Sequence, residues 1–197
     1  MPLQNRVDPT GIICFSSERG SLMGNRGHLH NEKKEIIRQY QLKRWIICVL
    51  EFKGWHRQVM QKGRYTELFF LDEATALAAG HRPCAECQRE RLTLFKKYWT
   101  TANEISIKSL TEMDDYLHIE RTNANKPEVS LQKLPDGVFV AYPSKSFLKY
   151  KNQLYEWSFG GYKAPILPDP ELLVKVLTPM SIVRTLDAGF SVQYNFH

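Results

Sequence analysis

Residues 68–99, LFFLDEATALAAGHRPCAECQRERLTLFKKYW, hold the signals that decide the fold. Their apolar start, residues 68–71, predicts a short buried strand. Asp72 can cap a helix, because its carboxylate accepts the free N–H groups of the first turn, and Gly80 can end that helix in the left-handed conformation. Pro83 loses no hydrogen bond at a first helical position, so a second helix is predicted from there to about Trp99.

This stretch also contains the Cys-x-x-Cys motif of the chain, Cys84 and Cys87. With a helix starting at Pro83, both sulfurs are expected on one helix face, one turn apart. Three interpretations stay open: two thiolates of a zinc site with further ligands from elsewhere, a redox-active pair, or a pair that only packs. A nucleoside deaminase is excluded, because it needs a His-x-Glu upstream of its cysteines, whereas His118-Ile119-Glu120 lies downstream.

Residues 72–87, DEATALAAGHRPCAEC, resemble the second half of the N-terminal zinc-binding domain of the bacterial Ada DNA-repair proteins. The resemblance implies a zinc site built on the two cysteines, with two more cysteines upstream, one of which accepts methyl groups from DNA. In the corresponding window, residues 51–57, the sequence has no cysteine and a single histidine, His56. Methyl transfer is therefore not expected. The resemblance implies zinc at Cys84, Cys87 and His56, with His81 as a weaker candidate.

Three residues outside this set, Cys14, His28 and His30, are more remote candidates for a metal ligand. Cys48 lies in a dense apolar run and is interpreted as a buried apolar residue. The Gly-rich segment at residues 20–30 lacks the ending of a phosphate-binding loop and is interpreted as a turn.

The composition is that of an ordinary soluble protein, with 43% hydrophobic and 24% charged residues among 197. No apolar run approaches the ~20 residues that a membrane helix needs, and the first residues contain no secretory signal. A cytoplasmic protein of bacterial type with reduced cysteines is expected.

The net charge of +6 is concentrated at the start of the chain, where residues 1–64 hold twelve Lys and Arg against five Asp and Glu. Such an excess is typical of a surface that faces DNA or RNA phosphates, and equally of a solvated basic face. The residues expected to contact nucleic acid are Arg26, Lys43, Arg44 and Arg57.

The patterns together predict an α+β chain in three parts. Residues 1–42 form a basic segment packed on the core. Residues 43–99 form a meander of three antiparallel strands, at 43–52, 55–60 and 65–71, followed by two helices. Residues 100–197 are mostly β, with one capped helix at about 179–188 and a closing strand at 190–196; residues 114–121 fit either a short helix or a strand.

Two functions follow as hypotheses. The first is a nucleic-acid-associated metal-binding protein that lacks the methyl-accepting thiol. The alternative is a metal-assisted hydrolase that uses Glu67, His81, and the polar cluster of His118 and Glu120.

Overall fold

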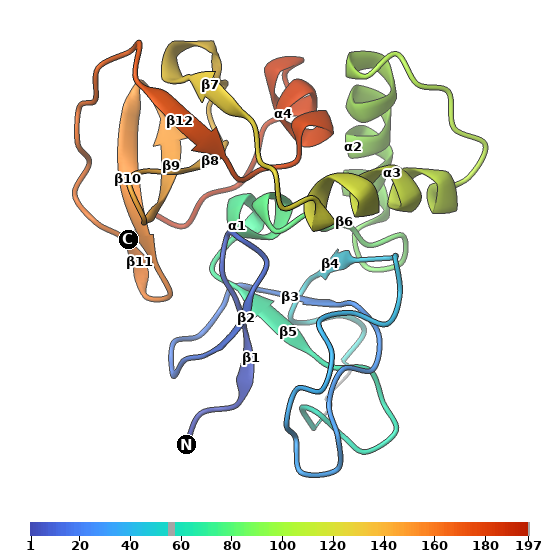
Figure 1. Cartoon of the computed structure of the whole chain (residues 1–197). Helices are drawn as coiled ribbons and strands as arrows, with labels where there is room; N and C mark the ends of the chain where they lie inside the picture. Colours follow the sequence, from blue (N-terminus) through green and yellow to red (C-terminus); the bar gives the residue numbers. More distant parts are fainter. Residues whose placement is uncertain (55–57, 197) are drawn as a thin grey trace.

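The computed structural model describes residues 1–54 and 58–196, and its architecture is α+β, as the sequence predicts (Figure 1). The first sheet contains β1 (Gln4–Val7), β2 (Ile13–Phe15), β3 (Leu22–Asn25), β4 (Ile46–Cys48), β5 (Leu68–Phe70) and β6 (Arg82–Pro83). The second contains β7 (Glu128–Ser130), β8 (Phe139–Ala141), β9 (Ser146–Tyr150), β10 (Gln153–Ser158), β11 (Gly161–Tyr162) and β12 (Leu173–Val176). The helices are α1 (Glu73–Ala78), α2 (Arg89–Ala102), α3 (Leu110–Thr122) and α4 (Met180–Asp187), with a short 3-10 helix at Leu131–Lys133.

The first sheet has the strand order β2-β1-β5-β3-β4-β6. β3, from residues 1–42, lies between β5 and β4, from residues 43–99, so the predicted three-strand meander is wrong. β4 pairs with β3 in antiparallel orientation and with β6 in parallel orientation, and it does not pair with β5, the next strand along the chain. Of the strand predicted at residues 55–60, residues 55–57 lie outside the described residues, and 58–60 are not in a strand.

The Gly-rich segment forms strand β3 rather than the predicted turn. Gly24 cannot be replaced without strain, because a Cβ added there would lie 2.3 Å from the carbonyl oxygen of Ile46 and 2.8 Å from the ring of Phe70. β3 lies between β4 and β5, and a glycine at this position allows both neighbouring strands to approach closely.

Helix α1 begins and ends as predicted and joins the two halves of the molecule. The Asp72 carboxylate accepts the N–H of Thr75 at 2.8 Å, and Gly80 ends the turn with φ +80°. From the second sheet, the Tyr162 hydroxyl donates to Asp72 at 2.7 Å and the Trp157 indole donates to Thr75 at 3.1 Å. All six residues of α1 are buried, so the helix is part of one continuous core between the sheets (Figure 1).

The second predicted helix starts later than the sequence pattern indicates, because α2 begins at Arg89. Arg82–Pro83 forms strand β6, and residues 84–88 form the turn that leads into α2. The predicted placement of both cysteines on one helix face, one turn apart, is therefore wrong, because Cys84 and Cys87 precede α2. The backbone N–H groups of Arg82 and Cys84 bond to the carbonyls of Trp45 and Ile47, which holds the segment against β4.

The second half of the chain largely follows the predicted pattern of hairpins. Its sheet has the order β11-β10-β9-β8-β12-β7, α4 follows β12, and residues 114–121 belong to α3. The predicted closing strand at 190–196 is wrong. Its backbone N–H groups at Gln193 and Asn195 bond to the buried carboxylates of Glu73 and Asp72 rather than to a sheet. None of the helices in the described residues has the length and apolar character needed to span a lipid bilayer.

Candidate metal centre

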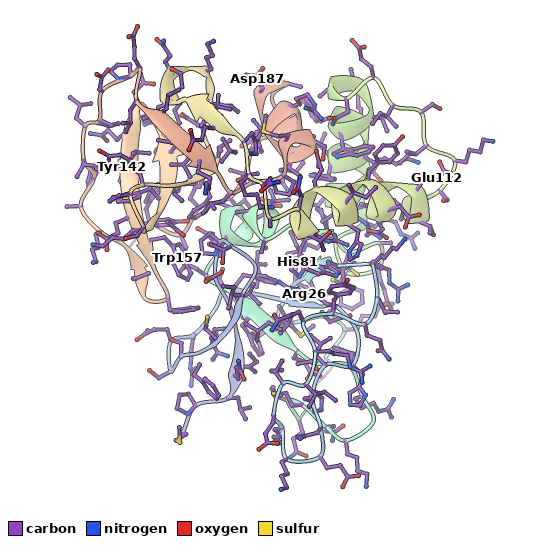
Figure 2. The ribbon with its side chains drawn as sticks, in the orientation of Figure 1. Arg26, His81, Glu112, Tyr142, Trp157 and Asp187 are labelled. Atoms are coloured by element: carbon purple, nitrogen blue, oxygen red, sulfur yellow. The ribbon has the colours of Figure 1, made fainter. Side chains whose placement is uncertain are left out.

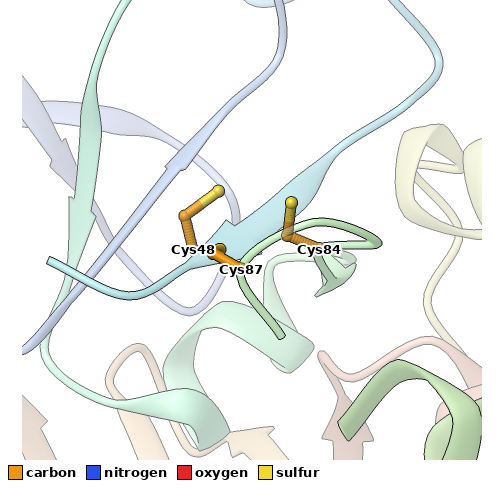
Figure 3. Close-up of side chains that lie close together, drawn as sticks. All are labelled: Cys48, Cys84 and Cys87. Carbon is orange, nitrogen blue, oxygen red and sulfur yellow. The ribbon is translucent and has the colours of Figure 1, made fainter. Parts of the chain in front are cut away.

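Three cysteine sulfurs converge at the edge of the first sheet (Figure 3). The Sγ atoms of Cys48, Cys84 and Cys87 all lie within 4.8 Å of one another. Cys48 is the last residue of β4, and the other two come from the turn between β6 and α2. Three sulfurs at this spacing can surround one metal ion, since Zn–S distances are about 2.3 Å.

The parallel pairing of β4 and β6 sets this geometry. The carbonyl of Ile47 accepts two hydrogen bonds, from the N–H of Cys84 and from the side-chain amide of Gln88, both at 2.9 Å. The turn is closed by the bond from the N–H of Gln88 to the carbonyl of Cys84 at 3.2 Å. The start and the end of the Cys-x-x-Cys turn are thus both fixed to the residue that precedes Cys48.

Backbone N–H groups point at the sulfurs, which favours thiolates. The N–H of Glu86 donates to the Cys84 sulfur at 3.4 Å. The hydrogen bond from Cys48, together with backbone N–H groups of Cys87 and Glu86, lowers the pKa of Cys84 to about 5 against the opposing effect of burial. The hydrogen bond to Cys84 and burial raise the pKa of Cys48, and burial raises that of Cys87. Of the three thiols, Cys84 is therefore the one that loses its proton most readily.

The sulfurs line a cavity of about 450 Å³, which is in the size range of small-molecule sites. Glu67 lines the same cavity, is 3% exposed, and accepts the backbone N–H of Met60 at 2.8 Å. Asn25 and Tyr65 add further polar atoms to its wall. A metal at the sulfurs would therefore share a cavity with a buried carboxylate, the group that the hydrolase hypothesis requires.

The two predicted histidine ligands have different outcomes. His56 lies outside the described residues, so its ligation stays a prediction. His81 is fully buried, and its Nε2 accepts from the Arg26 guanidinium at 3.2 Å. Its ring packs edge-on against Phe70, and burial, with Arg26 and Arg121 nearby, lowers its pKa well below the ordinary value. His81 is not among the residues that line the cavity of the sulfurs.

The three remote candidates are also placed away from the sulfurs. His30 is buried, with Nδ1 2.7 Å from the Thr66 hydroxyl, and His28 packs edge-on against it. Cys14 is half-buried and directs its thiol to the carbonyl of Ile12 at 3.7 Å.

The side chains of His118 and Glu120 contact different parts of the molecule, although both residues lie in α3. His118 packs against Tyr40 with ring centroids 4.8 Å apart, and its Nδ1 lies 3.3 Å from the Arg121 guanidinium. Glu120 points to the other side, where its carboxylate accepts the backbone N–H and the hydroxyl of Ser181 at the start of α4. Glu67 is therefore the one candidate catalytic residue that shares a cavity with the cysteines.

The predicted nucleic-acid residues are spread over different environments. Arg44 is exposed, and Lys43 is exposed in an ion pair with Asp115 at 2.8 Å. Arg26 is 1% exposed and turned inward, and Arg57 lies outside the described residues.

Cys48 is the member of the three-sulfur cluster that the sequence interpretation misses. Its apolar neighbours make it look like core, and it is indeed 8% exposed. The available signal was chemical: a thiol in a strand upstream of a Cys-x-x-Cys turn can complete a three-sulfur site if the strand and the turn pair. That pairing is tertiary, so spacing along the chain does not reveal it.

Comparison of the whole chain with protein-family models, with curated proteins and with solved structures gives no match.

Proposed function

We propose that this protein binds zinc at Cys48, Cys84 and Cys87. The observation that carries the proposal is the convergence of three Sγ atoms within 4.8 Å of one another, from a strand and a turn that hydrogen bonds hold together. Thiolate ligands select zinc, copper(I) or iron–sulfur clusters over hard cations, and a tetrahedral zinc ion accepts three thiolates readily. The pattern extends the zinc-domain resemblance of residues 72–87, with Cys48 in place of the upstream cysteines.

The fourth ligand decides what the metal does. A ligand from the protein, such as His56, would close the site and make zinc a structural element that fastens β4 to the turn before α2. A position left open to the cavity would give a catalytic site, in which the metal supplies Lewis-acid chemistry. The hydrolase hypothesis is supported by Glu67, because a buried carboxylate in the same cavity can accept a proton from an attacking water.

Metal analysis of the purified protein tests the site. We expect about one zinc per chain, with sulfur dominating its coordination in X-ray absorption. A fourth ligand of nitrogen supports the structural role, and an oxygen from water supports the catalytic one. Purified protein that contains no metal, and that takes up neither zinc nor cobalt after reduction, would contradict the proposal.

We also propose that this is a cytoplasmic protein associated with DNA or RNA. The support is the cluster of basic charge in the first third of the chain, much of it exposed on the described surface, at Arg19, Lys33, Arg38, Lys43, Arg44, Lys53, Lys62 and Arg64. Electrostatic contact with phosphates is sequence-independent and weakens steeply as salt rises.

Reversal of charge at Lys43 and Arg44 tests this association. We expect the double variant Lys43→Glu, Arg44→Glu to weaken binding for every nucleic-acid sequence alike, by about tenfold at ~50 mM salt, with a smaller salt slope. Gel retardation and fluorescence anisotropy measure both. The matched control is Lys145→Glu with Lys163→Glu, two exposed lysines that lie next to β9 and β11 and pair with Glu156. Wild-type protein that fails to retard DNA or RNA at this salt concentration excludes the association.

A further inference from the structure

A second cavity, separate from the cysteines, contains a buried cation without an acidic partner. Arg26 follows β3 and is 1% exposed. Its Nη1 donates to the carbonyl of Gly11 at 2.9 Å and its Nε to His81, whereas Nη2 has no hydrogen-bond partner within the described chain. Figure 2 shows Arg26 and His81 close together at the centre of the molecule. An unsatisfied buried guanidinium is costly, so its retention calls for a reason.

Asp8 is the acidic residue that acts on Arg26, and it does not neutralise the guanidinium charge. Asp8 raises the pKa of Arg26, but burial and the charge of Arg121 outweigh it and lower that pKa to about 9. The Asp8 carboxylate is held by its own turn, where it accepts from Thr10 and from the N–H of Ile12. Arg26 makes no ion pair among the described residues.

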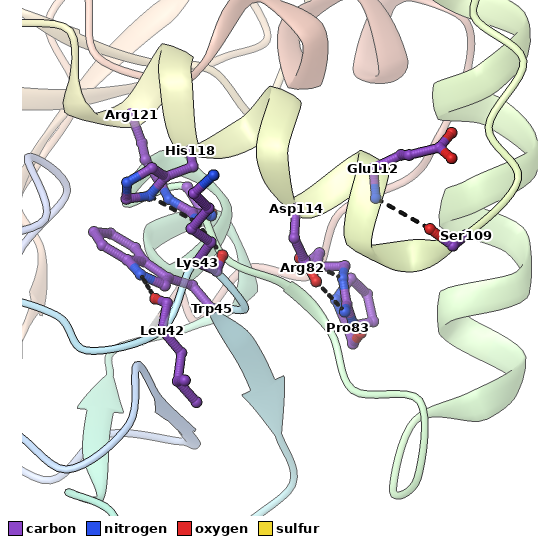
Figure 4. Close-up of polar contacts among 11 residues, drawn as sticks. Leu42, Lys43, Trp45, Arg82, Pro83, Ser109, Glu112, Asp114, His118 and Arg121 are labelled. Carbon is purple, nitrogen blue, oxygen red and sulfur yellow. Dashed lines mark hydrogen bonds and ion pairs between the residues drawn. The ribbon is translucent and has the colours of Figure 1, made fainter.

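Arg121 of α3 brings a second guanidinium to the same place. The guanidinium carbons of Arg26 and Arg121 lie 3.8 Å and 4.1 Å from the ring centroid of Trp45, so both cations contact one indole (Arg121 in Figure 4). Arg121 donates to the carbonyls of Gly80 and Lys43, but its Nε is buried without a partner within the described chain. Burial lowers the pKa of Arg121 to about 9, although Asp114 opposes that shift.

A third cation, Lys126, completes the cavity. Its ammonium donates to the carbonyls of Glu120 and Arg121 at the end of α3. The cavity measures about 390 Å³, and Arg26, Arg121 and Lys126 all line it together with Tyr40, Trp45 and the loop of Thr10 and Gly11. No Asp or Glu belongs to the described lining.

We propose that this cavity binds the phosphate group of a phosphomonoester. Guanidinium forks match phosphate oxygens in geometry, and an incoming dianion would partner the Nη2 of Arg26 and neutralise the mutual repulsion of Arg26 and Arg121. A cavity of 390 Å³ is larger than a phosphate needs, so it has room for the organic group that carries it. Tyr40, which is 43% exposed, offers that group an aromatic face.

The competing explanation is a purely structural cluster, in which the three cations bind backbone carbonyls only. It accounts for Nη1 of Arg26 and for Lys126, but it leaves Nη2 of Arg26 and Nε of Arg121 buried and unsatisfied. It also predicts that phosphate has no effect on the folded protein, which separates the two explanations by experiment.

The test uses the full-length protein with inorganic phosphate, adenosine monophosphate and adenosine, at constant ionic strength, by isothermal titration calorimetry and thermal unfolding. We expect both phosphate compounds to bind and to raise the unfolding temperature, and adenosine to bind at least about tenfold more weakly than its monophosphate. Lys126→Met and Arg26→Lys should each weaken phosphate binding about tenfold or more, because each loses charged hydrogen bonds. Lys97→Met, a change at an exposed lysine of α2, should have no effect.

Three results overturn the proposal: no phosphate-dependent heat or stabilisation in the wild-type protein, equal binding by the cavity variants and Lys97→Met, or acetate binding as tightly as phosphate. Circular dichroism checks that the variants fold, and the wild-type measurement decides the question if they do not.

A single-stranded oligonucleotide with and without a 5′-phosphate identifies the source of the phosphate group. If the protein binds the 5′-phosphorylated oligonucleotide more tightly than the unphosphorylated one, the phosphate is that of a nucleic-acid end. If it binds adenosine monophosphate and neither oligonucleotide, the phosphate is that of a free small molecule. No described residue that lines this cavity also lines the cavity of the three cysteines.

Discussion

Replacement of Cys48 by serine is expected to release the zinc and to lower the free energy of unfolding by about 4 kcal/mol, if free zinc exceeds its dissociation constant by about 1,000-fold. The reason is linkage: a metal that binds only the folded state adds its binding free energy to folding. In the proposed site Cys48 would supply the ligand from β4, and Cys84 and Cys87 would supply those from the turn, so loss of Cys48 would also remove the link between the two segments. Zinc content by elemental analysis and urea unfolding with and without a chelator measure both effects.

Cys14→Ser is the matched control, because this cysteine is half-buried in β2 and lies outside the three-sulfur cluster. It should keep the zinc and change stability by well under 1 kcal/mol, as surface substitutions ordinarily do. If the cysteines only pack, Cys48→Ser should resemble an ordinary small core change, and chelators should leave the wild-type unfolding curve where it is. A Cys48→Ser protein with a full complement of zinc would disprove this site.

Features set by local chemistry could be predicted from the sequence. The Asp72 cap, the left-handed Gly80 and the helix between them depend on residues within one turn of each other, and all three are confirmed. The helix α4 and the left-handed Gly189 after it, with φ +104°, are also confirmed, whereas the predicted side-chain cap of α4 is wrong, because Pro179 is its N-cap. Each of these signals involves hydrogen bonds between near neighbours, which the order of residues directly encodes.

Features set by tertiary pairing could not be predicted. Pro83 is compatible with a first helical position, but the hydrogen bonds of its neighbours Arg82 and Cys84 to β4 place it in a strand. Gly24 resembles a turn residue, yet it serves the close approach of β3 to β4 and β5. The sequence does not predict Cys48 as part of the candidate metal site for the same reason. Cys48 lies near Cys84 only because β4 and β6 pair, and nothing near Cys48 in the chain indicates that pairing.

The two candidate sites are built on the same pair of strands. Trp45 lies just before β4, and Cys48 is the last residue of that strand. In β3, Met23 pairs with Cys48 near one end of the strand, and Arg26 follows the opposite end. The sulfurs therefore lie at one end of this strand pair, and the stacked guanidinium groups lie at the other. Since β6 pairs with β4 and leads directly into the turn that carries Cys84 and Cys87, a contact that holds β6 in place also positions two of the three sulfurs.

The contact that holds β6 against α3 is a buried ion pair, in which Arg82 donates from Nε and Nη2 to both oxygens of Asp114, at 2.9 and 2.8 Å (Figure 4). Their side chains are 2% and 5% exposed, so water cannot replace a lost partner. Asp114→Asn should therefore lower the free energy of unfolding by about 3 kcal/mol, because it leaves the Arg82 charge buried and uncompensated. Urea unfolding measures the change as a shift of the midpoint at constant slope.

The neighbouring residue supplies a control for this prediction, because Asp115 pairs with Lys43 at 2.8 Å on the surface, where the two side chains are 46% and 59% exposed. Asp115→Asn should change the free energy of unfolding by less than about 1 kcal/mol, the usual limit for an exposed pair. The double variant Arg82→Met, Asp114→Leu should be more stable than Asp114→Asn, since it removes both buried charges and fills their volume. Equally small losses of unfolding free energy in Asp114→Asn and Asp115→Asn would show that the Arg82–Asp114 pair does not hold β6 in place. In that case the hydrogen bonds to β4, or a bound zinc ion, would be what positions the turn at residues 84–88.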